Sequence, residues 1–546
     1  MIFKIVNNIP DKIETDTVYL CFIDFDDYGY CTTYSVHIKD IQDSFIVKIG
    51  CRSLDSKVNP SKSLHGFDSY SINEIIPQEF SKSNPLPDDF FSLGQSIPYY
   101  KVINDVFKER SSEYYEVIKD IAFKFERFEA LYNSREACLK DSLMRIVHYS
   151  DVEQFHRISV GDSELTSYNF EFTYDNDSGK HIEFLVNPDS LPPSNIHVII
   201  GRNGVGKTGL LFQMANCILK NMKMNVDDYS SAKYKINSDF ALENRETRFA
   251  SVVGVSFSVF DDGLSSIRLA LIDKVNEQEK LRLQEEFNKR YKYIGLIKSS
   301  TGSISQSGEN NPVSIKTVSE LSTEFENVLN EIASDSYKKS LYLEVCENLE
   351  VDEMFRDNCF ISGLKDYLKE PDKDIADILQ SFKHLSSGHM IIILSLTTLC
   401  ESIHEKTIVF IDEPETHLHP PLLSTYIRTL SILLRRRNAI GIIATHSPIV
   451  LQEVPRFCVT KVERVEGEMT FYRPEVETFA AGMDQLIREI FGHEVIKTGF
   501  YKLIEDNLQC NFEKTYAKFD KKIGFLGQIM IQGLLNRSGG DKDEED

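Results

Sequence analysis

Apolar and polar residues alternate along the first 55 positions of the chain. The segments VYLCFIDF, YCTTYSVHI and SFIVKIGC each have the period of two that is expected of a strand with one buried face. Turn-forming residues separate them in DDYGY and KDIQD. The pattern predicts a small β-meander, in which DFDD at residues 24–27 is a turn and not a metal-binding cluster. Residues 101–132 then show a helical period, so we expect residues 1–150 to form a mixed α/β lobe.

Three uninterrupted apolar runs predict strands that are buried on both faces: IHVII, TIVFI and AIGIIA. They indicate an α/β core in two pieces, residues 151–263 and residues 383–460. Between these pieces, residues 264–382 predict a helical insertion, because they contain charged helical segments and one helix with an apolar face. That face carries Leu321, Phe325, Val328 and Ile332. Residues 461–546 are assigned to a C-terminal lobe that ends in the acidic tail DKDEED.

Composition narrows the class of protein. A chain of 546 residues suits two or three lobes, and its net charge of −23 argues against a surface built to coat nucleic acid. Any contact with nucleic acid must be focal, at a few basic spots. Such spots are more commonly the solvated ends of helices. These spots are Arg435–Arg437 and Lys518 with Lys521 and Lys522. The ten cysteines lack metal-ligand spacing, and no segment looks like a leader or a membrane span, so we expect a soluble, cytoplasmic protein without a membrane partner.

The segment GRNGVGKT, residues 201–208, has the pattern of a phosphate-binding loop. It follows the predicted strand IHVII and opens an apolar helix, which is the context that such a loop requires. Its glycines let the backbone wrap the phosphates, Lys207 reaches the terminal phosphates, and Thr208 holds Mg²⁺ through its hydroxyl. The predicted ATP-binding residues of this loop are Gly201, Asn203, Gly204, Gly206, Lys207 and Thr208.

Two acidic residues end the apolar strand in IVFIDEPE. Packing alone does not explain two carboxylates at this point. We expect Asp412 to hold Mg²⁺ through water, and Glu413 to polarise the attacking water as the catalytic base. His446 follows the next buried strand, in ATHSP, where an imidazole can touch the γ-phosphate.

The segment LSSGH, residues 385–389, leads directly into the apolar run MIIILSL. Ser387 and Gly388 at the start of such a helix leave backbone N–H groups pointing outward, and a helix terminus of this kind attracts phosphate. The chain therefore has a second predicted phosphate contact in addition to its P-loop.

In this order, these segments resemble the motifs of the ABC-type ATPase superfamily. The resemblance implies an α/β fold with a mixed sheet and flanking helices, in which GRNGVGKT is Walker A and LSSGH is the signature motif. Walker B then ends at Asp412 with the catalytic Glu413, and His446 is the switch histidine. The resemblance also implies a homodimer with composite ATP sites, in which Ser387 and Gly388 of one subunit close on the ATP of the other.

Two positions depart from the superfamily pattern. His389 stands where the signature usually has Gln or Glu. At the place of the Q-loop glutamine, the segment VVGVSFSVFDD offers Ser256, Ser258 and Asp261. The first departure leaves the helix-terminus contact through Ser387 and Gly388 intact, whereas the second concerns the coupling between the nucleotide and the helical insertion.

Within the superfamily, DEPETHLHP and ATHSP are similar to the soluble branch that OLD-type nucleases share with defence ATPases. HLHP is then a loop beside the subunit interface, not a metal-binding pair formed by His417 and His419. Too few residues follow ATHSP for a Toprim domain, so no intrinsic nuclease is expected. The layout resembles the PtuA ATPases of Septu anti-phage systems. This resemblance implies a regulatory ATPase with a separate PtuB-like HNH nuclease and, in a retron setting, a reverse transcriptase with its msDNA.

Two other classes stay open. A RecF-like or SMC-like repair ATPase would act directly on DNA. The insertion lacks the sustained heptads and the CxxC hook of the long coiled-coil members, so RecF-like clamping fits better. A transporter ATP-binding subunit is disfavoured by the long N-terminal lobe and by the HLHP loop.

Overall fold

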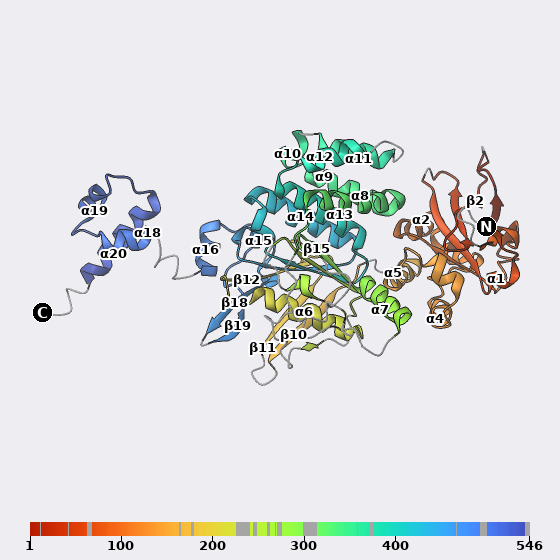
Figure 1. Ribbon diagram of the computed structural model, residues 1–546, viewed down its shortest axis with the longest axis horizontal. Coiled ribbons are helices and arrows are strands. Elements are labelled where there is room, and N and C mark those ends of the chain that lie inside the picture. The colour runs from red at the N-terminus through yellow and green to blue at the C-terminus, as the bar shows by residue number, and fades with distance from the viewer. Residues whose placement is uncertain are drawn as a thin grey trace.

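The computed structural model describes the chain except for residues 11, 42, 63–67, 163–164, 176–179, 225, 227–240, 244–247, 259–262, 268, 270–275, 299–313, 358, 371–374, 466, 492–499 and 541–546. The described residues form an N-terminal lobe, a central body built on a large sheet, and short C-terminal helices (Figure 1). None of the described helices is both long enough and apolar enough to cross a membrane. The predicted linker STGSISQSGENNP, the acidic tail and Asp261 lie outside the described residues.

The N-terminal lobe contains a six-stranded sheet, in the order β8-β1-β2-β4-β5-β9, and a small three-stranded sheet, β3-β7-β6, with helices packed against the larger sheet. Strands β2, β4 and β5 are antiparallel neighbours, as the predicted meander requires, but β1 runs parallel to β2. The strands are β1 (Ile2–Val6), β2 (Thr17–Ile23), β3 (Tyr30–Cys31), β4 (Thr33–Ile38), β5 (Phe45–Cys51), β6 (Ser61–Lys62), β7 (Asp68–Ser71), β8 (Glu79–Ser81) and β9 (Phe90–Gly94). The helices are α1 (Leu54–Lys57), α2 (Ile97–Phe107), α3 (Ser111–Val117), α4 (Phe125–Asn133) and α5 (Tyr149–Ser159).

The lobe extends beyond the predicted boundary at residue 150. Val152, Phe155 and Ile158 of α5 are buried in the same apolar core as the six-stranded sheet. Since these side chains lose their contact with water only against the lobe, α5 belongs to it and not to the ATPase core.

The DFDD segment is a turn only in part. Asp26 accepts a hydrogen bond from the Gly29 N–H at 2.7 Å, as a turn residue does. Asp27, in contrast, is 1% exposed and lies 2.6 Å from both the Lys48 and the Arg145 side-chain nitrogens. This acid therefore joins β5 to the helical half of the lobe through a buried ion pair.

The central body is a seven-stranded sheet in the order β15-β14-β16-β17-β12-β18-β19, in which every neighbouring pair is parallel except β18 with β19. A smaller sheet, β11-β10-β13, lies beside it. The strands are β10 (Tyr168–Asp175), β11 (Lys180–Val186), β12 (Ile196–Gly201), β13 (Ala241–Glu243), β14 (Ser251–Ser256), β15 (Tyr291–Gly295), β16 (Thr407–Asp412), β17 (Ile440–Thr445), β18 (Val459–Val465) and β19 (Glu468–Tyr472).

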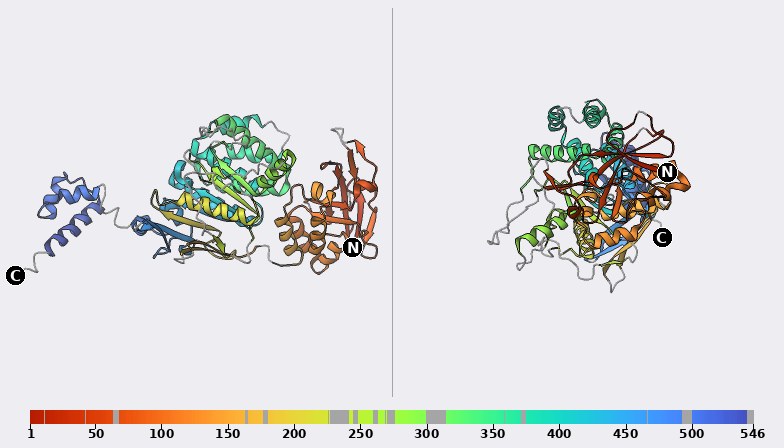
Figure 2. Two further views of the ribbon diagram at one scale, coloured as in Figure 1. Left: turned by 60° about the horizontal axis from the view of Figure 1, so that its bottom comes forward. Right: turned by 90° about the vertical axis from the view of Figure 1, so that its right-hand side faces the viewer.

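Successive residues of the central strands face two different cores. Val409 and Ile411 of β16 pack with α13 (Ser387–Ser402) and α14 (Pro420–Arg436). Ile408 and Phe410 of the same strand pack with α6 (Lys207–Asn221) and the smaller sheet. Figure 2 shows these layers on either side of the sheet. Burial on both faces explains why the strands are uninterrupted apolar runs in the sequence.

The helical insertion is shorter than predicted. Residues 291–295 form β15, which pairs with β14, so this part of the expected insertion belongs to the sheet. The face of α8 that carries the four predicted apolar residues is buried, as expected. The helices from the sheet edge onward are α7 (Glu277–Arg290), α8 (Val318–Ser334), α9 (Ser336–Leu349), α10 (Glu353–Asp357), α11 (Phe360–Lys369) and α12 (Ala376–Lys383).

The C-terminal boundary also differs from the expected one. Strands β18 and β19 continue past residue 461 and complete the large sheet, because β18 pairs with the P-loop strand β12. The remaining helices are α15 (Pro448–Gln452), α16 (Met483–Phe491), α18 (Phe500–Asp506), α19 (Phe512–Lys518) and α20 (Phe525–Gly540).

Helix α5 joins the N-terminal lobe to the residues just before the Walker B strand β16. Arg157 forms an ion pair with Glu405, and the Glu153 carboxylate lies 2.9 Å from the Lys406 amine. Glu405 is fully buried, and burial raises its pKa to about 7 although Arg157 opposes that effect. The lobe is therefore anchored to the end of β16 opposite Asp412.

Candidate nucleotide-binding site

The P-loop connects the end of β12 to the start of α6. Gly204 and Gly206 have φ values of +79° and +106°, a backbone conformation that favours glycine. A Cβ at Gly201 would lie 2.4 Å from the Val462 carbonyl oxygen, because β18 runs beside β12 at this point. The loop therefore needs glycine for its turn and for close approach of the neighbouring strand.

Lys207 is the first residue of α6 and is 4% exposed. Its amine donates to the carbonyl oxygens of Gly201 and Arg202, each at 3.0 Å. Burial lowers the pKa of Lys207, and the nearby carboxylates of Glu413 and Asp412 oppose this effect. The loop thus folds around its own cation, while Arg202, Asn203 and Gly204 are exposed.

Thr208 and Asp412, the two predicted Mg²⁺ ligands, lie in contact. The Thr208 hydroxyl donates to Asp412 Oδ2 at 2.7 Å, and Asp412 is 5% exposed. The contact forms because β12 and β16 lie on either side of β17, so their carboxyl ends meet at one edge of the sheet. A hydroxyl and a carboxylate oxygen beside a phosphate-binding loop fit Mg²⁺ with ATP.

Glu413 and His446 lie at the same edge. Glu413 has a φ of +45° and donates its backbone N–H to the Ala444 carbonyl at 2.9 Å. Its Oε1 atom lies 3.8 Å from His446 Nδ1, and both side chains are partly exposed. Non-glycine residues rarely adopt this backbone conformation, so Glu413 is a strained position directly after the strand.

Glu415 was not predicted, although it belongs to the same short sequence, DEPE. Its Oε1 accepts hydrogen bonds from the Thr445 hydroxyl at 2.6 Å and from the His446 N–H at 2.7 Å. The signal that could have found it is Pro414, which starts the short turn Pro414–His417 and brings Glu415 back toward β17.

Arg464 is a second residue that sequence reasoning missed. Its Nη2 atom lies 3.7 Å from the position of a Cβ at Gly206, and Met469 of the same β18–β19 hairpin lies closer, at 2.8 Å. Arg464 is exposed. The hairpin therefore brings the Arg464 guanidinium next to the phosphate-binding turn. No motif in the sequence predicts this contact.

The LSSGH segment begins α13, but its contacts differ from the expected ones. The side chain that caps the helix belongs to Ser386, which lies 2.6 Å from His389 Nδ1. His389 is 4% exposed, and its other ring nitrogen lies 3.3 Å from Asp352. His389, which replaces the usual Gln or Glu, therefore stabilises the start of α13 through contacts within the chain.

Ser387 and Gly388 differ in their exposure. Ser387 is exposed, whereas Gly388 is buried against the loop that follows Walker B. A Cβ at Gly388 would lie 2.6 Å from the His417 carbonyl oxygen. The structure thus places Gly388 beside the HLHP loop of its own chain and not beside its own P-loop.

The two histidines of HLHP have separate contacts. His417 Nε2 lies 3.2 Å from the Phe257 carbonyl oxygen, and His419 caps α14 by accepting from the Leu422 N–H at 3.4 Å. In the part of the chain that the structure describes, no group of three or more His, Cys, Asp and Glu residues could hold a metal ion.

At the place of the Q-loop, Ser256 is the last residue of β14 and lies beside Asp412 in the strand pairing. It is fully buried. Ser258 follows the strand and is partly exposed, so of the two serines only Ser258 is accessible.

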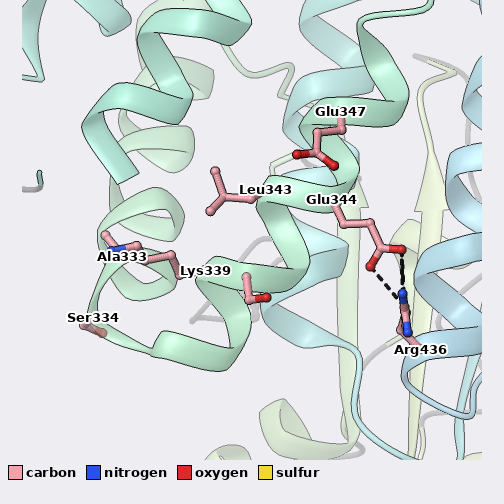
Figure 3. A pocket seen from close by; sticks show the side chains of 8 residues that line it. Ala333, Ser334, Lys339, Leu343, Glu344, Glu347 and Arg436 are labelled. Atoms are coloured by element: carbon pink, nitrogen blue, oxygen red, sulfur yellow. Dashed lines mark hydrogen bonds and ion pairs between the residues drawn. The ribbon is translucent and has the colours of Figure 1, made fainter. Parts of the chain in front are cut away.

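The basic spot Arg435–Arg437 is occupied by contacts within the chain. Arg436 forms a bidentate ion pair with Glu344 of α9, at 2.9–3.3 Å (Figure 3). It lines a cavity of about 710 Å³ between the insertion and α14, together with Lys339 and Glu347. Arg437 is 7% exposed and lies over the Tyr337 ring at 4.5 Å. Two of the three arginines are therefore engaged in holding the insertion.

A comparison with known families covers the segment that contains this site. Residues 196–452 match the family model described as AAA domain, putative AbiEii toxin, Type IV TA system. The matched segment contains the P-loop, the acid pair and His446, so the chain carries an ATPase domain of the AAA class.

Over nearly its whole length the chain is also 32% identical to protein ea59 of Escherichia phage lambda, in an alignment that covers 97% of each protein. The chain therefore belongs to the family of protein ea59.

Two solved structures show a more distant likeness. One is cbiO1 from Clostridium perfringens, part of the ABC transporter complex cbiONQ, at 16% identity and a TM-score of 0.25, covering 62% of this chain and 100% of that one. The other is the SmcHead bound to the C-winged helix domain of ScpA, at 11% identity and a TM-score of 0.26, covering 56% and 97%. Likeness at this level assigns no function.

Proposed function

We propose that the protein is an ATP-binding and ATP-hydrolysing regulatory subunit of an anti-phage defence complex. The observation that carries the enzymatic part is the meeting of Lys207, the Thr208–Asp412 pair, Glu413 and His446 at one edge of the sheet. The family description, which names a putative toxin of a toxin–antitoxin system, and the relative from a phage both support a role in conflicts that involve phages.

In this proposal each side chain of the site has one task. The P-loop backbone and Lys207 bind the phosphates, and Thr208 with Asp412 holds Mg²⁺, which neutralises charge on the phosphate oxygens. Glu413 accepts a proton from the attacking water, and the neighbouring His446 contacts the terminal phosphate. Because Lys207 is a buried cation within the P-loop, its main effect in this proposal is on the binding of the phosphates.

We further propose a homodimer in which each ATP is shared between two chains. Ser387 is exposed at the first turn of α13, whose outward N–H groups suit phosphate. Gly388 packs on the loop that follows Glu413, so a change at one ATP site reaches the signature that serves the other. In this proposal, the contact of Gly388 with the loop after Glu413 couples the two ATP sites of the dimer.

The effector in this proposal is a separate PtuB-like HNH nuclease, joined in a retron setting by a reverse transcriptase and its msDNA. Support comes from the resemblance of the motifs to PtuA ATPases of Septu systems. The helical insertion, which rests on α14 through the Arg436–Glu344 ion pair, is the surface proposed for docking.

The enzymatic part is tested with two substitutions that act on different steps. Lys207→Ala should weaken ATP binding at least roughly tenfold, because it removes the cation that faces the phosphates. Glu413→Gln should keep binding within a factor of about three and lower turnover roughly 100-fold or more. Nucleotide affinity and phosphate release are measured for both variants. Equal loss of affinity in the two would contradict the role given to Glu413.

The effector part is tested by purifying the tagged chain from its native host. Recovery of a small HNH protein supports the proposal, whereas duplex DNA alone supports direct action on DNA by a RecF-like or SMC-like ATPase. The purified chain is then incubated with DNA and tRNA in Mg²⁺ or Mn²⁺. Cleavage that stays at constant specific activity through further purification would show an intrinsic nuclease and overturn the regulatory role.

A further inference from the structure

The β18–β19 hairpin packs directly on the P-loop. A Cβ at Gly201 would lie 2.4 Å from the Val462 carbonyl oxygen, and a Cβ at Gly206 would lie 2.8 Å from the terminal methyl carbon of Met469. Arg464 is the strand partner of Met469, and its Nη2 atom would lie 3.7 Å from the same Cβ position. The hairpin therefore carries a guanidinium to the turn of the phosphate-binding loop.

The side chain of Arg464 lies on the same face of the large sheet as α6. Val462, two residues earlier in β18, and Met469 both belong to the apolar core that α6 shares with the smaller sheet. Because alternate residues of a strand point to the same face, Arg464 points to the side on which the P-loop opens α6. Arg464 is exposed, so its guanidinium is accessible to a ligand at this point.

The acidic residues beside Arg464 are paired with other cations. A carboxylate oxygen of Glu463 lies 2.9 Å from the Lys461 amine, and one of Glu468 lies 2.6 Å from the Lys180 amine. Among the residues that the structure describes, Arg464 takes part in no ion pair. Its charge is therefore available to an anion, and the fork of guanidinium N–H donors matches the oxygens of a phosphate.

The order of the strands determines which end of a nucleotide Arg464 can meet. Strand β17, and β16 beyond it, lie on one side of β12, whereas β18 lies on the other side. In the proposed reaction the terminal phosphate faces Glu413 and His446, which follow β16 and β17. A nucleotide held by the P-loop then directs its terminal phosphate away from β18, and the phosphate next to the ribose lies on the β18 side.

We propose that Arg464 binds the phosphate that is attached to the ribose, the α-phosphate, and so adds to the affinity for ATP and ADP alike. The proposal rests on the proposed nucleotide site, to which it adds a residue outside the Walker A, Walker B and signature motifs. A contact that is made equally with substrate and transition state raises affinity without raising turnover. The effect of Arg464 is therefore on binding, unlike that of Glu413.

The direct test is titration calorimetry of the full chain with ADP and with a non-hydrolysable ATP analogue, both with Mg²⁺. Arg464→Ala should weaken the binding of both nucleotides by a similar factor, roughly tenfold, because it removes a charge-assisted contact to a group that both share. Arg464→Lys, which keeps the charge but loses the fork, should lose roughly threefold. Arg488→Ala is the matched control, since it removes the same side chain from an exposed position on α16, and it should bind like the wild type.

Turnover gives the second measurement. In Arg464→Ala, KM for ATP should rise roughly tenfold while kcat stays within about twofold of the wild type. A fall in kcat with KM unchanged would place Arg464 at the reacting phosphate and overturn the proposal. A loss of affinity for the ATP analogue but not for ADP would overturn it for the same reason.

Equal affinities in the wild type and Arg464→Ala would overturn this proposal and leave the proposed function intact. If the wild type binds neither nucleotide, the proposed function fails and this proposal fails with it. Thermal melts without nucleotide verify that each variant is folded. If Arg464→Ala is unfolded, the affinity of Arg464→Lys decides the question, and a value equal to that of the wild type would overturn the proposal.

Discussion

Glycines in this protein are fixed by backbone atoms of other segments. A Cβ at Gly201 would meet the Val462 carbonyl oxygen, and a Cβ at Gly388 would meet that of His417. A main-chain oxygen cannot swing aside as the end of a flexible side chain can. A methyl group added at either glycine therefore pushes two backbone segments apart. At Gly388 the second segment is the loop that follows Walker B.

We expect Gly388→Ala to destabilise the protein by about 1–3 kcal/mol, the cost of overpacking a tight site, because the new methyl group would lie against the His417 carbonyl oxygen. Gly363→Ala in α11 is the matched control: it lies in a helix with no atom within 4 Å of the new Cβ, so alanine should be neutral or stabilise by up to about 1 kcal/mol. Urea unfolding measures both. Similar effects at the two positions would show that α13 and the HLHP loop are not tightly packed.

The two ends of strand β16 contact different parts of the molecule. Its last residue, Asp412, contacts Thr208, and the residues before its first, His404 to Lys406, contact α5 of the N-terminal lobe. The strand is six residues long and buried throughout. This buried strand therefore joins the lobe, at the buried acid Glu405, to the proposed Mg²⁺ ligand Asp412.

Glu405 should make stability fall as pH rises. Its pKa is raised from 4.5 to about 7 in the folded protein, first by burial, so the native state holds a proton that the unfolded chain has already released. The stabilisation is present below about pH 4.5 and is lost as pH rises toward 7. Relative to Glu405→Gln, the wild type should lose roughly 1–3 kcal/mol between about pH 5 and pH 8. Thermal melts of both proteins across this range measure the difference, and parallel curves would contradict the prediction.

For the molecule as a whole, the ATPase core is one large sheet that three strands from two further segments of the chain complete. The edge strand β15 lies between α7 and α8, and β18 and β19 come after His446. In the proposed homodimer, the exposed start of α13 is the part of this core that would contact the ATP of the second chain.

Mixed dimers test this arrangement. Ser387→Glu places a carboxylate at an exposed first-turn position, where a negative charge suits the helix dipole but repels the ATP of a partner chain. Alone, this variant should bind nucleotide with turnover lowered roughly tenfold or more. Mixed equally with Lys207→Ala, it should recover roughly a quarter of wild-type turnover, because half of randomly paired dimers are mixed and each has one intact site. Activity no higher than that of either variant alone, in confirmed mixed dimers, would rule out shared sites.

The sequence was sufficient for features that depend on short contiguous segments. The P-loop, the strand ending at Asp412 and Glu413, and the buried face of α8 each follow from local residue types and periods, since backbone conformation and burial on both faces leave a direct trace in the chain.

Features that depend on contacts between distant segments could be identified only from the tertiary structure. Residues 291–295 became part of the sheet because they pair with β14, and no period in the sequence separates an edge strand from a helical insertion. Gly388 meets His417, Arg464 reaches Gly206, and Glu415 reaches His446 only because parallel strands bring their carboxyl ends and the loops between them to one edge. The sequence alone was sufficient to predict the candidate site residues. The residues that contact and orient them were determined by which strands are neighbours in the sheet.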